Sequence, residues 1–292
     1  MTHPTNLPSP LPPSTEVADH FDAFHAARTH TDLVSRLYER AMGENYPHEV
    51  AASSSCDWPL LGLMAARLRM RPGQMLVDAG CGTGGIGLWL ARALAVRLEG
   101  IDISPVALAQ ATKRQGRFVH ADRAAFRVAS LDATGLPDGC ADGAVCVDAL
   151  GFAADRGEAV RELGRILAPG ARLTLTRSAK QGAEPAWEEQ ARAAGLTVEH
   201  IDERPGEPAM WARLYQLWIE HADDLQRELG DTQARNMLYE AHRMLPALHG
   251  RRAVLLTLRR PANWHVGPAA ADRMPGPGRP GEGPATSERT SQ

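Results

Sequence analysis

The sequence predicts an α/β fold: a doubly wound, mostly parallel β-sheet with a helical N-terminal cap and a two-helix lid inserted before the last strand. Three observations support this prediction. Short apolar runs alternate with helical stretches between about residues 74 and 204, helical periodicity precedes that segment, and two more helical stretches precede a final apolar run, RRAVLLTLRR. With 292 residues, of which 43% are hydrophobic, the chain is long enough for one substantial core.

The two ends of the chain differ in composition from the rest. Residues 1–13 contain five prolines, and residues 261–292 alternate Pro, Gly, Ser and Thr with almost no large apolar groups. Both segments are predicted to be disordered, because such compositions bury too little apolar surface to offset the lost chain entropy. The N-terminus has no basic region followed by an apolar stretch, and no apolar run approaches 18 residues. We therefore expect neither a simple export signal nor a membrane span.

Between these ends, the sequence divides into a cap and a sheet domain. Residues 14–72 carry apolar stripes at helical spacing and are predicted to form the helical cap. Residues 73–260 are predicted to form the sheet domain, because apolar strands and helices alternate along most of it. Within this domain, residues 208–249 are interpreted as two lid helices with a break at Gly230. Their position before the last strand places them over the carboxyl edge of the sheet.

Charge and cysteine content narrow the classes of function. Lys plus Arg (32) nearly balance Asp plus Glu (35), which leaves a formal net charge of −3. Nucleic acid and membrane are therefore not expected as partners, because both attract strongly basic surfaces. The four cysteines lack C-x-x-C spacing and are too few for a disulfide framework, so we expect a reducing, cytoplasmic location. No Asp, Glu, His or Cys cluster has the spacing of metal ligands, and no metal site is predicted.

The most informative segment is an apolar strand that runs into a glycine-rich turn, LVDAGCGTGGIG at residues 76–87. Glycine is needed where the backbone turns tightly and lies against a ligand without an intervening Cβ. Gly80, Gly82 and Gly85 match the pattern G-x-G-x-x-G, so a dinucleotide-binding loop is one interpretation. This pattern alone is weakly specific. The residues that follow the neighbouring strands are therefore needed to infer which nucleotide the loop binds.

Two acidic residues follow the next two predicted strands. Asp102 lies about 20 residues beyond the glycines, where a carboxylate can accept hydrogen bonds from both hydroxyls of a ribose. Asp132 follows the third strand at the same sheet edge, where it can accept a hydrogen bond from the exocyclic amine of adenine. The two acids together describe a cradle for adenosine that requires no diphosphate.

In this order, the motifs resemble those of class I S-adenosylmethionine (SAM)-dependent methyltransferases, which have a Rossmann-like fold. The resemblance covers residues 74–177 and rests on VDAGCGTGGIG (V-D-x-G-C-G-T-G), GIDIS, SLDATGLP (D-A-x-x-L-P), VCVDAL and LAPGARLTLT. The family often has Phe after the L-P element, where this chain has Asp138, which affects only a packing position. The resemblance implies transfer of a methyl group from SAM to an oxygen, nitrogen or carbon atom of a small molecule, with S-adenosylhomocysteine as product. The implied setting is secondary (natural product) metabolism.

The resemblance also implies roles for individual residues at the ends of the first four strands. The residues that it implies for the cofactor are Asp78, Gly80, Cys81, Gly82, Asp102, Ile103, Leu131, Asp132, Ala133 and Asp148. Asp78 and the glycine turn would line the methionine part of the cofactor. Asp102 would hold the ribose with Ile103 against the adenine, and the segment at Asp132 would meet the adenine edge. Asp148 and Leu150 would face the sulfonium and the acceptor.

Candidate bases for the acceptor lie in the cap and lid. The segment around Tyr46 resembles one that closes over SAM in small-molecule methyltransferases. Under that resemblance Tyr46 contacts the cofactor or acceptor, and His48 is the favoured base. His221 and His242, in the lid, are further candidates. An alcohol or phenol acceptor needs a base, an amine acceptor has only to be neutral, and a carbon acceptor needs an electron-rich ring or a stabilised cation with later deprotonation.

An aromatic stripe in the lid is the candidate wall for the acceptor. Trp211, Tyr215 and Trp218 are spaced by four and three residues and share one helical face. They either pack the lid onto the sheet domain or form part of a pocket for a flat or partly apolar molecule.

Two other functions stay open at this point. An NAD(P)-dependent oxidoreductase would use the same glycines, although Asp132 and the lack of a Tyr-x-x-x-Lys pair disfavour it. A non-catalytic SAM-binding protein would keep the fold without turnover, which the acidic residues at the strand ends argue against. The helical cap and lid could also form the interface of a homodimer.

Overall fold

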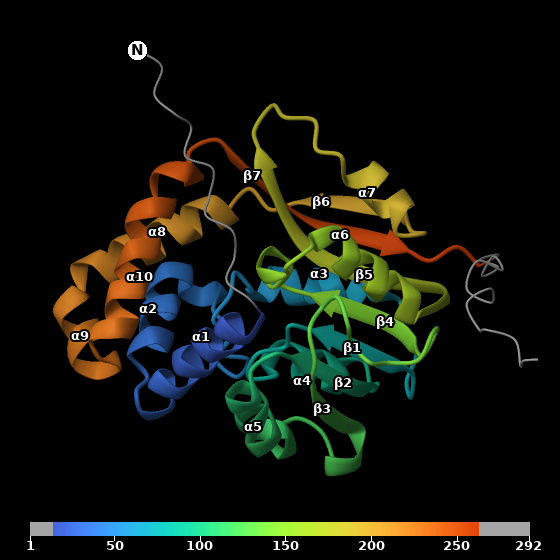
Figure 1. Cartoon of the computed structure of the whole chain (residues 1–292), viewed down its shortest axis with the longest axis horizontal. Helices are drawn as coiled ribbons and strands as arrows, with labels where there is room; N and C mark the ends of the chain where they lie inside the picture. Colours follow the sequence, from blue (N-terminus) through green and yellow to red (C-terminus); the bar gives the residue numbers. More distant parts are fainter. Residues whose placement is uncertain (1–13, 263–292) are drawn as a thin grey trace, which may run out of the picture. The chain divides into compact units, whose positions relative to one another are not determined.

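A computed structural model describes residues 14–262, which form one seven-stranded sheet in the order β3-β2-β1-β4-β5-β7-β6 (Figure 1). The strands are Met75–Ala79 (β1), Arg97–Asp102 (β2), Ala124–Val128 (β3), Ala141–Cys146 (β4), Leu167–Lys180 (β5), Thr197–Glu203 (β6) and Arg251–Arg259 (β7). Strands β1 to β5 pair in parallel, whereas β7 runs antiparallel to both β5 and β6. The predicted mostly parallel, doubly wound sheet is confirmed. The predictions of disorder for 1–13 and 263–292 lie outside the described residues.

Helices cover both faces of this sheet. The helices are Ser14–Ala27 (α1), Leu33–Met42 (α2), Trp58–Leu68 (α3), Gly85–Ala93 (α4), Pro105–Arg114 (α5), Arg156–Ile166 (α6), Trp187–Ala193 (α7), Glu207–Glu220 (α8), Ala222–Leu229 (α9) and Asp231–Met244 (α10). Helices α3, α4 and α5 cover one face, and α6 and α7 cover the other. This arrangement follows from the right-handed crossovers that connect parallel strands.

Each central strand divides its side chains between two apolar layers. Leu76, Val145 and Leu255 pack with α3 and α4, whereas the adjacent residues Val77 and Ala144 pack with α6 and α7. Successive side chains of a strand point to opposite faces, so a continuously apolar strand is buried on both sides. The continuous apolar runs of the sequence are explained by this double burial.

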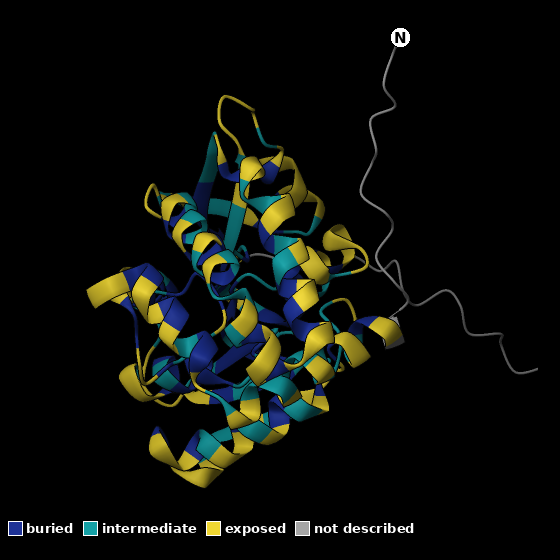
Figure 2. Cartoon of the chain, turned by 90° about the vertical axis from the view of Figure 1, so that its left-hand side faces the viewer, coloured by how far each residue is buried: buried dark blue, intermediate teal, exposed yellow. Residues whose placement is uncertain are grey.

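The third apolar cluster joins segments that are far apart in the sequence. Helices α1 and α2 lie beside α8, α9 and α10 in Figure 1, and α2 packs on α8. In Figure 2, the helices on this side carry both exposed and buried residues, as amphipathic helices do. The predicted cap therefore divides: α1 and α2 join the lid, while α3 packs against the sheet through Leu60, Leu61, Met64 and Leu68.

The lid differs from the prediction in its number of helices. Between β6 and β7, a stretch that the structure describes throughout, there are three α-helices and a short 3-10 helix, Pro246–Leu248, where the sequence predicted two helices. The chain leaves the helical conformation at Gly230, as predicted, and also at His221, where φ is −104° and ψ is 28°. No Gly or Pro marks the second break, and packing of Leu225 and Leu229 into the third cluster accompanies it. Tertiary packing has overridden a locally continuous helical pattern here.

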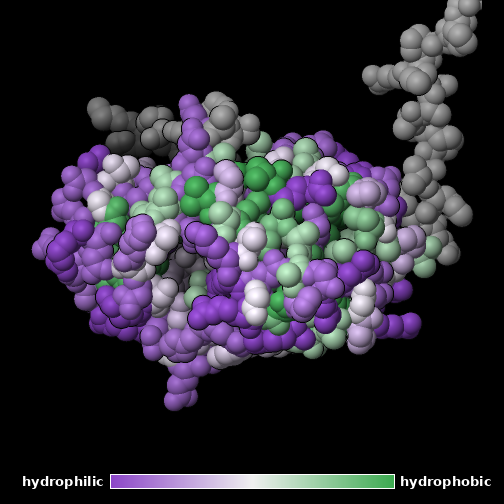
Figure 3. Space-filling model, turned by 90° about the horizontal axis from the view of Figure 1, so that it is seen from below, coloured by the Kyte–Doolittle hydropathy of each residue, from purple (hydrophilic) through white to green (hydrophobic). Residues whose placement is uncertain are grey.

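Surface hydropathy varies over the molecule. Hydrophilic residues cover much of the face shown in Figure 3, and hydrophobic residues gather across its middle. Within residues 14–262, none of the helices combines the length and apolar character that a bilayer crossing requires.

Candidate functional site

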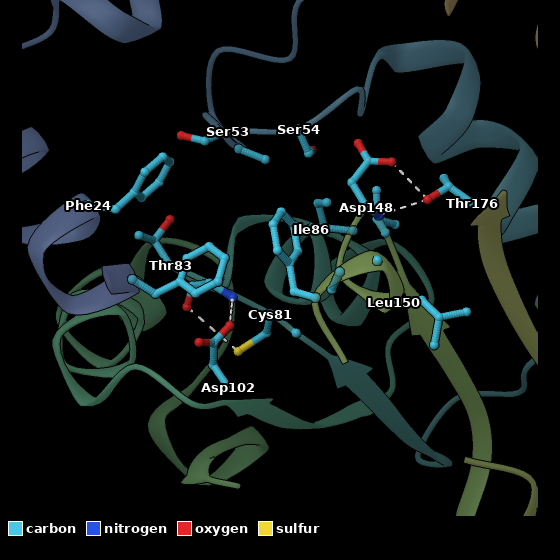
Figure 4. Close-up of a pocket in the computed structure, with 18 of the residues that line it drawn as sticks. Phe24, Ser53, Ser54, Cys81, Thr83, Ile86, Asp102, Asp148, Leu150 and Thr176 are labelled. Atoms are coloured by element: carbon cyan, nitrogen blue, oxygen red, sulfur yellow. Dashed lines mark hydrogen bonds between the residues drawn. The ribbon is translucent and has the colours of Figure 1, made fainter. Parts of the chain in front are cut away.

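A cavity of about 1050 Å³ lies where the carboxyl ends of β1 to β4 meet the cap and lid helices. In Figure 4, Asp102 and Cys81 lie toward one end of this cavity and Asp148 and Thr176 toward the other, with Phe24 of α1 across from the strands. Open α/β sheets bind ligands in this crevice, where the strand order reverses. Here the reversal falls between β1 and β4.

The glycine turn forms the floor of one end of the cavity. Gly80 has φ +76°, and its N–H and that of Cys81 donate to the carbonyl of Ile101 at 2.8 and 2.9 Å. A Cβ added at Gly80 would overlap the Cβ of Ala149, so the position requires glycine on two grounds. Gly82 has φ +52°, and a Cβ there would lie 3.7 Å from the His25 ring. The turn thus exposes backbone to a narrow space beneath α1.

Asp102 ends β2 beside this turn. Its Oδ2 accepts from the N–H of Gly82 at 2.7 Å, and its Oδ1 accepts from the N–H of Ser104 at 2.9 Å. Burial raises the pKa of Asp102, while these backbone N–H groups favour its charged form. A carboxylate oxygen has two acceptor positions, so each oxygen keeps one for a ligand. This arrangement can accept hydrogen bonds from two neighbouring hydroxyl groups.

Asp78 does not reach the cavity wall. Its side chain is 2% exposed and lies behind the turn, where Oδ2 accepts from the N–H of Gly87 at 2.9 Å. Burial raises the pKa of Asp78 to about 7. The predicted contact with the methionine part of the cofactor is corrected accordingly: side chains alternate along β1, and this one points into the layer beneath α4. Asp78 fixes the first turn of α4 instead.

The segment after β3 forms the next part of the wall. Leu131 and Asp132 line the cavity, as does Ile103 after β2. The hydroxyl of Ser130 donates to Asp132 Oδ1. Ala133 does not line the cavity, because the chain turns back at Ser130, which makes an isolated bridge with it. Of the residues predicted to meet the adenine, Leu131 and Asp132 therefore line the cavity and Ala133 does not.

The end of β4 supplies a tightly held carboxylate. Asp148 has φ +54°, and its Oδ1 accepts from the hydroxyl of Thr176 on β5 at 2.8 Å. Its Oδ2 accepts from the N–H of Ser55 at 2.6 Å. Arg204 binds the same segment by donating to the carbonyl of Ser55 at 2.5 Å. These contacts join β4, β5 and the loop before α3 around one side chain on the cavity wall.

The lid aromatics belong both to the cavity wall and to the core. Trp211, Tyr215, Trp218 and Leu150 all line the cavity. Tyr215 and Trp218 are also buried in the third apolar cluster, with 4% and 3% of their surfaces exposed. The rings of Trp211 and Tyr215 stack with centroids 5.4 Å apart. The stripe therefore packs in the core and also lines the same cavity as Asp102 and Asp148.

Tyr46 and the three candidate bases, His48, His221 and His242, lie elsewhere. Tyr46 is buried under α2 and α8, and His48 beside it is largely exposed, with Nε2 3.6 Å from Glu39 Oε1. His221 bonds to Asp224 at 2.9 Å, and His242 bonds to the carbonyl of Leu238 at 2.7 Å. None of the four lines the cavity. The prediction of Tyr46 and His48 as catalytic residues is corrected, because α1 and the 51–54 segment cover the cavity in place of their loop.

Several polar residues of the wall were not found from the sequence. His25 of α1 lies over the glycine turn, and burial together with the charge of Arg28 lowers its pKa to about 4, which keeps the imidazole neutral. Glu207 of α8 and Glu240 of α10 also line the cavity, and burial raises the pKa of each. Of these three residues, only His25 could have been found from the sequence, because it follows Phe21 by four residues and so lies on the same face of the predicted helix. Among the described residues, no group of three or more His, Cys, Asp or Glu side chains could hold a metal ion.

Comparison with known sequences identifies relatives of part of the chain. Residues 77–175 match the family model described as a methyltransferase domain. The 27-O-demethylrifamycin SV methyltransferase of Amycolatopsis mediterranei (strain S699) is 31% identical over 56% of this chain and 58% of its own length. An O-methyltransferase of Pyrenophora dematioidea is 32% identical over 58% of this chain and 57% of its own. The chain therefore matches a little under three fifths of the length of these relatives.

Comparison with solved structures covers more of the chain. The [4+2]-cyclase SpnF has a TM-score of 0.67 at 22% identity, covering 86% of this chain and 97% of SpnF. Geranyl diphosphate methyltransferase in complex with GPP and sinefungin has a TM-score of 0.54 at 17% identity, covering 85% and 100%. At such identities the likeness shows the fold alone. Since one protein is named a cyclase and the other a methyltransferase, the reaction has to be argued from the site.

Proposed function

We propose that residues 77–175, which match the methyltransferase-domain model, form a class I SAM-dependent methyltransferase domain, and that this protein transfers the methyl group of SAM to an oxygen atom of a small molecule. The observation that carries the proposal is the pair of compartments in one cavity. Asp102 and the glycine turn lie at one end, and Trp211 and Tyr215 of the lid lie at the other. A cofactor and an acceptor bound side by side would need such an arrangement.

The residues present fit the cofactor. Each oxygen of Asp102 keeps one acceptor position for a ribose hydroxyl, and Gly82 leaves the space that a Cβ would fill beneath His25. Asp132 is placed to accept from the adenine amine, with Ile103 and Leu131 along the ring. Gly80 and Cys81 would lie along the methionine part. Ala133 and Asp78 are not part of this proposal.

The cofactor supplies a methyl group on a positively charged sulfur, which is already activated for transfer. The protein then has to hold the acceptor oxygen in line with the methyl group and exclude water. Helix α1 covers the cavity, and Phe21 meets Phe152 edge to face, with ring centroids 5.0 Å apart. Asp148, anchored by Thr176, and Leu150 would set the boundary between the cofactor and acceptor compartments.

The class of acceptor is proposed from the wall and from the relatives. Aromatic lid residues suit a flat or partly apolar molecule, and the net charge of −3 does not favour nucleic acid. Relatives named for O-methylation support oxygen over nitrogen or carbon, and we place the acceptor among natural products of secondary metabolism. A cytoplasmic location and a homodimer formed through the cap and lid are proposed on the sequence alone.

Calorimetric titration of the full-length protein with S-adenosylhomocysteine, and separately with NADH, tests the proposal. Micromolar binding of S-adenosylhomocysteine alone is expected. NADH binding alone would replace the proposal with an NAD(P)-dependent oxidoreductase. A panel of hydroxylated acceptors that includes 27-O-demethylrifamycin SV then follows release of S-adenosylhomocysteine from SAM. Cofactor binding without any methylated product across the panel would favour a non-catalytic SAM-binding protein.

A further inference from the structure

Several residues of the cavity wall have buried side-chain polar atoms without hydrogen-bond partners. Within residues 14–262, eight buried side-chain nitrogen or oxygen atoms make no hydrogen bond, and four of them belong to cavity-wall residues: Arg28 Nε, Glu207 Oε2, Trp218 Nε1 and Arg251 Nε. Buried polar groups are almost always hydrogen-bonded, since leaving one unpaired is unfavourable. Four such atoms on residues of one cavity wall are available to complementary polar groups of a ligand.

Glu207 is the single acceptor in this set, and its carboxylate is held at one oxygen only. Oε1 accepts from Trp211 Nε1 at 3.0 Å and from Arg251 Nη2 at 3.1 Å. Oε2 is buried and has no hydrogen-bond partner anywhere in the described chain. The side chain is 3% exposed. Because two donors fix Oε1, Oε2 is left positioned and free to accept a proton or a hydrogen bond.

Charged groups from three directions act on Glu207. Burial raises its pKa, Arg251 on β7 and Arg204 before α8 lower it, and Asp148 after β4 raises it. Glu207 and Asp148 both line the cavity. A carboxylate whose pKa is raised by burial is a stronger base than an exposed one, which suits it to take a proton from a bound hydroxyl group.

We propose that Glu207 binds the hydroxyl group of the acceptor and takes its proton during methyl transfer, so that the acceptor is an alcohol or a phenol. This inference rests on the proposed function. In the transfer, the bond between the acceptor oxygen and the methyl carbon forms while the bond between that carbon and sulfur breaks, and the electron pair stays on sulfur. The hydroxyl proton passes to Glu207 Oε2, from which it returns to water after the product leaves.

The other three unpaired atoms describe the rest of the acceptor. Arg28 Nε, Trp218 Nε1 and Arg251 Nε are all donors, so they complement carbonyl or ether oxygens. Trp211 and Tyr215 supply apolar surface beside them. The acceptor class is therefore a hydroxylated molecule with further oxygen atoms on a largely apolar skeleton. A pure hydrocarbon chain would leave these donors unpaired.

The test compares two probes of nearly equal shape, 2-naphthol and 2-methylnaphthalene, of which only the first has a hydroxyl donor. Their affinities are measured by ligand-observed NMR for the full-length protein, for Glu207→Gln and for Glu220→Gln. The glutamine of the first variant would keep its amide oxygen on Trp211 and Arg251 and present its amide nitrogen, which cannot accept. Glu220 lies exposed at the far end of the same helix and serves as the matched control.

The wild type and Glu220→Gln are expected to bind 2-naphthol about tenfold more tightly than 2-methylnaphthalene, and Glu207→Gln is expected to lose this preference. The wild-type preference should also weaken as the pH is lowered, because a protonated carboxyl is the weaker acceptor and burial raises the pKa of Glu207. Glu207→Gln should show no such pH dependence. Equal preference in wild type and Glu207→Gln, or no binding of 2-naphthol by wild type, would overturn the inference.

Titration of the same three proteins with S-adenosylhomocysteine separates this inference from the proposed function. All three are expected to bind it within about twofold of one another, since Glu207 lies outside the adenosine cradle. Loss of S-adenosylhomocysteine binding by all three, with the hydroxyl preference intact, would overturn the proposed function and the proton transfer, but would leave the binding of a hydroxyl group by Glu207 in place. Retained cofactor binding without the hydroxyl preference would overturn the role of Glu207 alone.

Discussion

The backbone N–H of Ser55 donates a hydrogen bond to Oδ2 of Asp148 at 2.6 Å, which ties the loop before α3 to the end of β4. The hydroxyl of Thr176 occupies the other oxygen of Asp148 and also accepts from its N–H at 2.7 Å. Asp148 has φ +54°, a backbone conformation that costs a non-glycine residue on the order of 1 kcal/mol or more. Side-chain contacts on both oxygens therefore stabilise a strained residue on the cavity wall.

Asp148→Ala is expected to release the loop that contains Ser55. The backbone amide of Ser55 should exchange its hydrogen on the order of tenfold faster or more, because its hydrogen bond to the Asp148 carboxylate is lost. Hydrogen-exchange mass spectrometry of peptides covering residues 51–57 measures this. Asp155→Ala is the matched control, since Asp155 also accepts from backbone N–H groups, at the start of α6. Unchanged exchange in the 51–57 peptides would contradict the anchoring role of Asp148.

Asp102→Ala should weaken binding of S-adenosylhomocysteine severely, because two ribose hydroxyls lose a charged acceptor. The expected loss is on the order of 2–3 kcal/mol. Calorimetric titration measures it, with thermal unfolding to verify that the turn at Gly82 remains folded. Asp223→Ala, at an exposed aspartate of α9, should bind as the wild type does. Unchanged affinity of Asp102→Ala for S-adenosylhomocysteine would contradict the assignment of Asp102 to the ribose.

Gly80→Ala is expected to destabilise the protein more than the same substitution at Gly135, another glycine with positive φ. Both Gly80 (φ +76°) and Gly135 (φ +67°) have left-handed backbone conformations, which cost alanine about 1–2 kcal/mol. At Gly80 the new Cβ also overlaps that of Ala149, whereas at Gly135 the described residues leave the space open. Urea denaturation should show a loss of about 3 kcal/mol or more for Gly80→Ala. Equal losses in Gly80→Ala and Gly135→Ala would mean that the turn relaxes around the new side chain.

Asp78→Asn should change how stability depends on pH. Burial raises the pKa of Asp78 to about 7 in the folded state, above its value of 3.8 in the unfolded chain. Between these two pKa values, the folded protein therefore binds one proton more than the unfolded chain. The stability that this proton contributes is lost as the pH rises, by at most about 1.4 kcal/mol per pH unit. The free energy of unfolding of Asp78→Asn should fall less steeply from pH 4 to 7 than that of wild type.

Urea denaturation across this pH range measures the difference. Asp223→Asn is the control, because this exposed side chain should leave the wild-type slope unchanged. Parallel slopes in wild type and Asp78→Asn would show that Asp78 is charged in the folded protein.

The sheet and the cofactor end of the cavity were predictable because their signals are local. An apolar run forms a strand that is buried on both faces, and the glycines after β1 are fixed by the backbone angles that the turn requires. Asp102 could be placed because the carboxyl ends of parallel strands share one edge. The same logic failed for Asp78 and Ala133, since strand position does not reveal which side chain points behind the turn.

The acceptor end was not predictable in the same way. His48 lies in a polar loop that the sequence placed near the cavity, yet α1 covers the cavity in its stead and brings His25 over Gly82. The break at His221 depends on how α9 packs, and the burial of Glu207 depends on where α8 meets Arg251 of β7. These contacts join residues many positions apart.

The sequence by itself determined the doubly wound sheet, the glycine turn and the acid at the end of β2, because periodicity and backbone conformation are properties of short segments. Only the tertiary structure decided which side chains surround the acceptor. The free oxygen of Glu207, the donors of Arg28 and Trp218 and the neutral ring of His25 come from separate helices. These groups are close together because amphipathic helix faces pack against one another. Many sequences can form such faces, so no local sequence pattern indicates which side chains will meet.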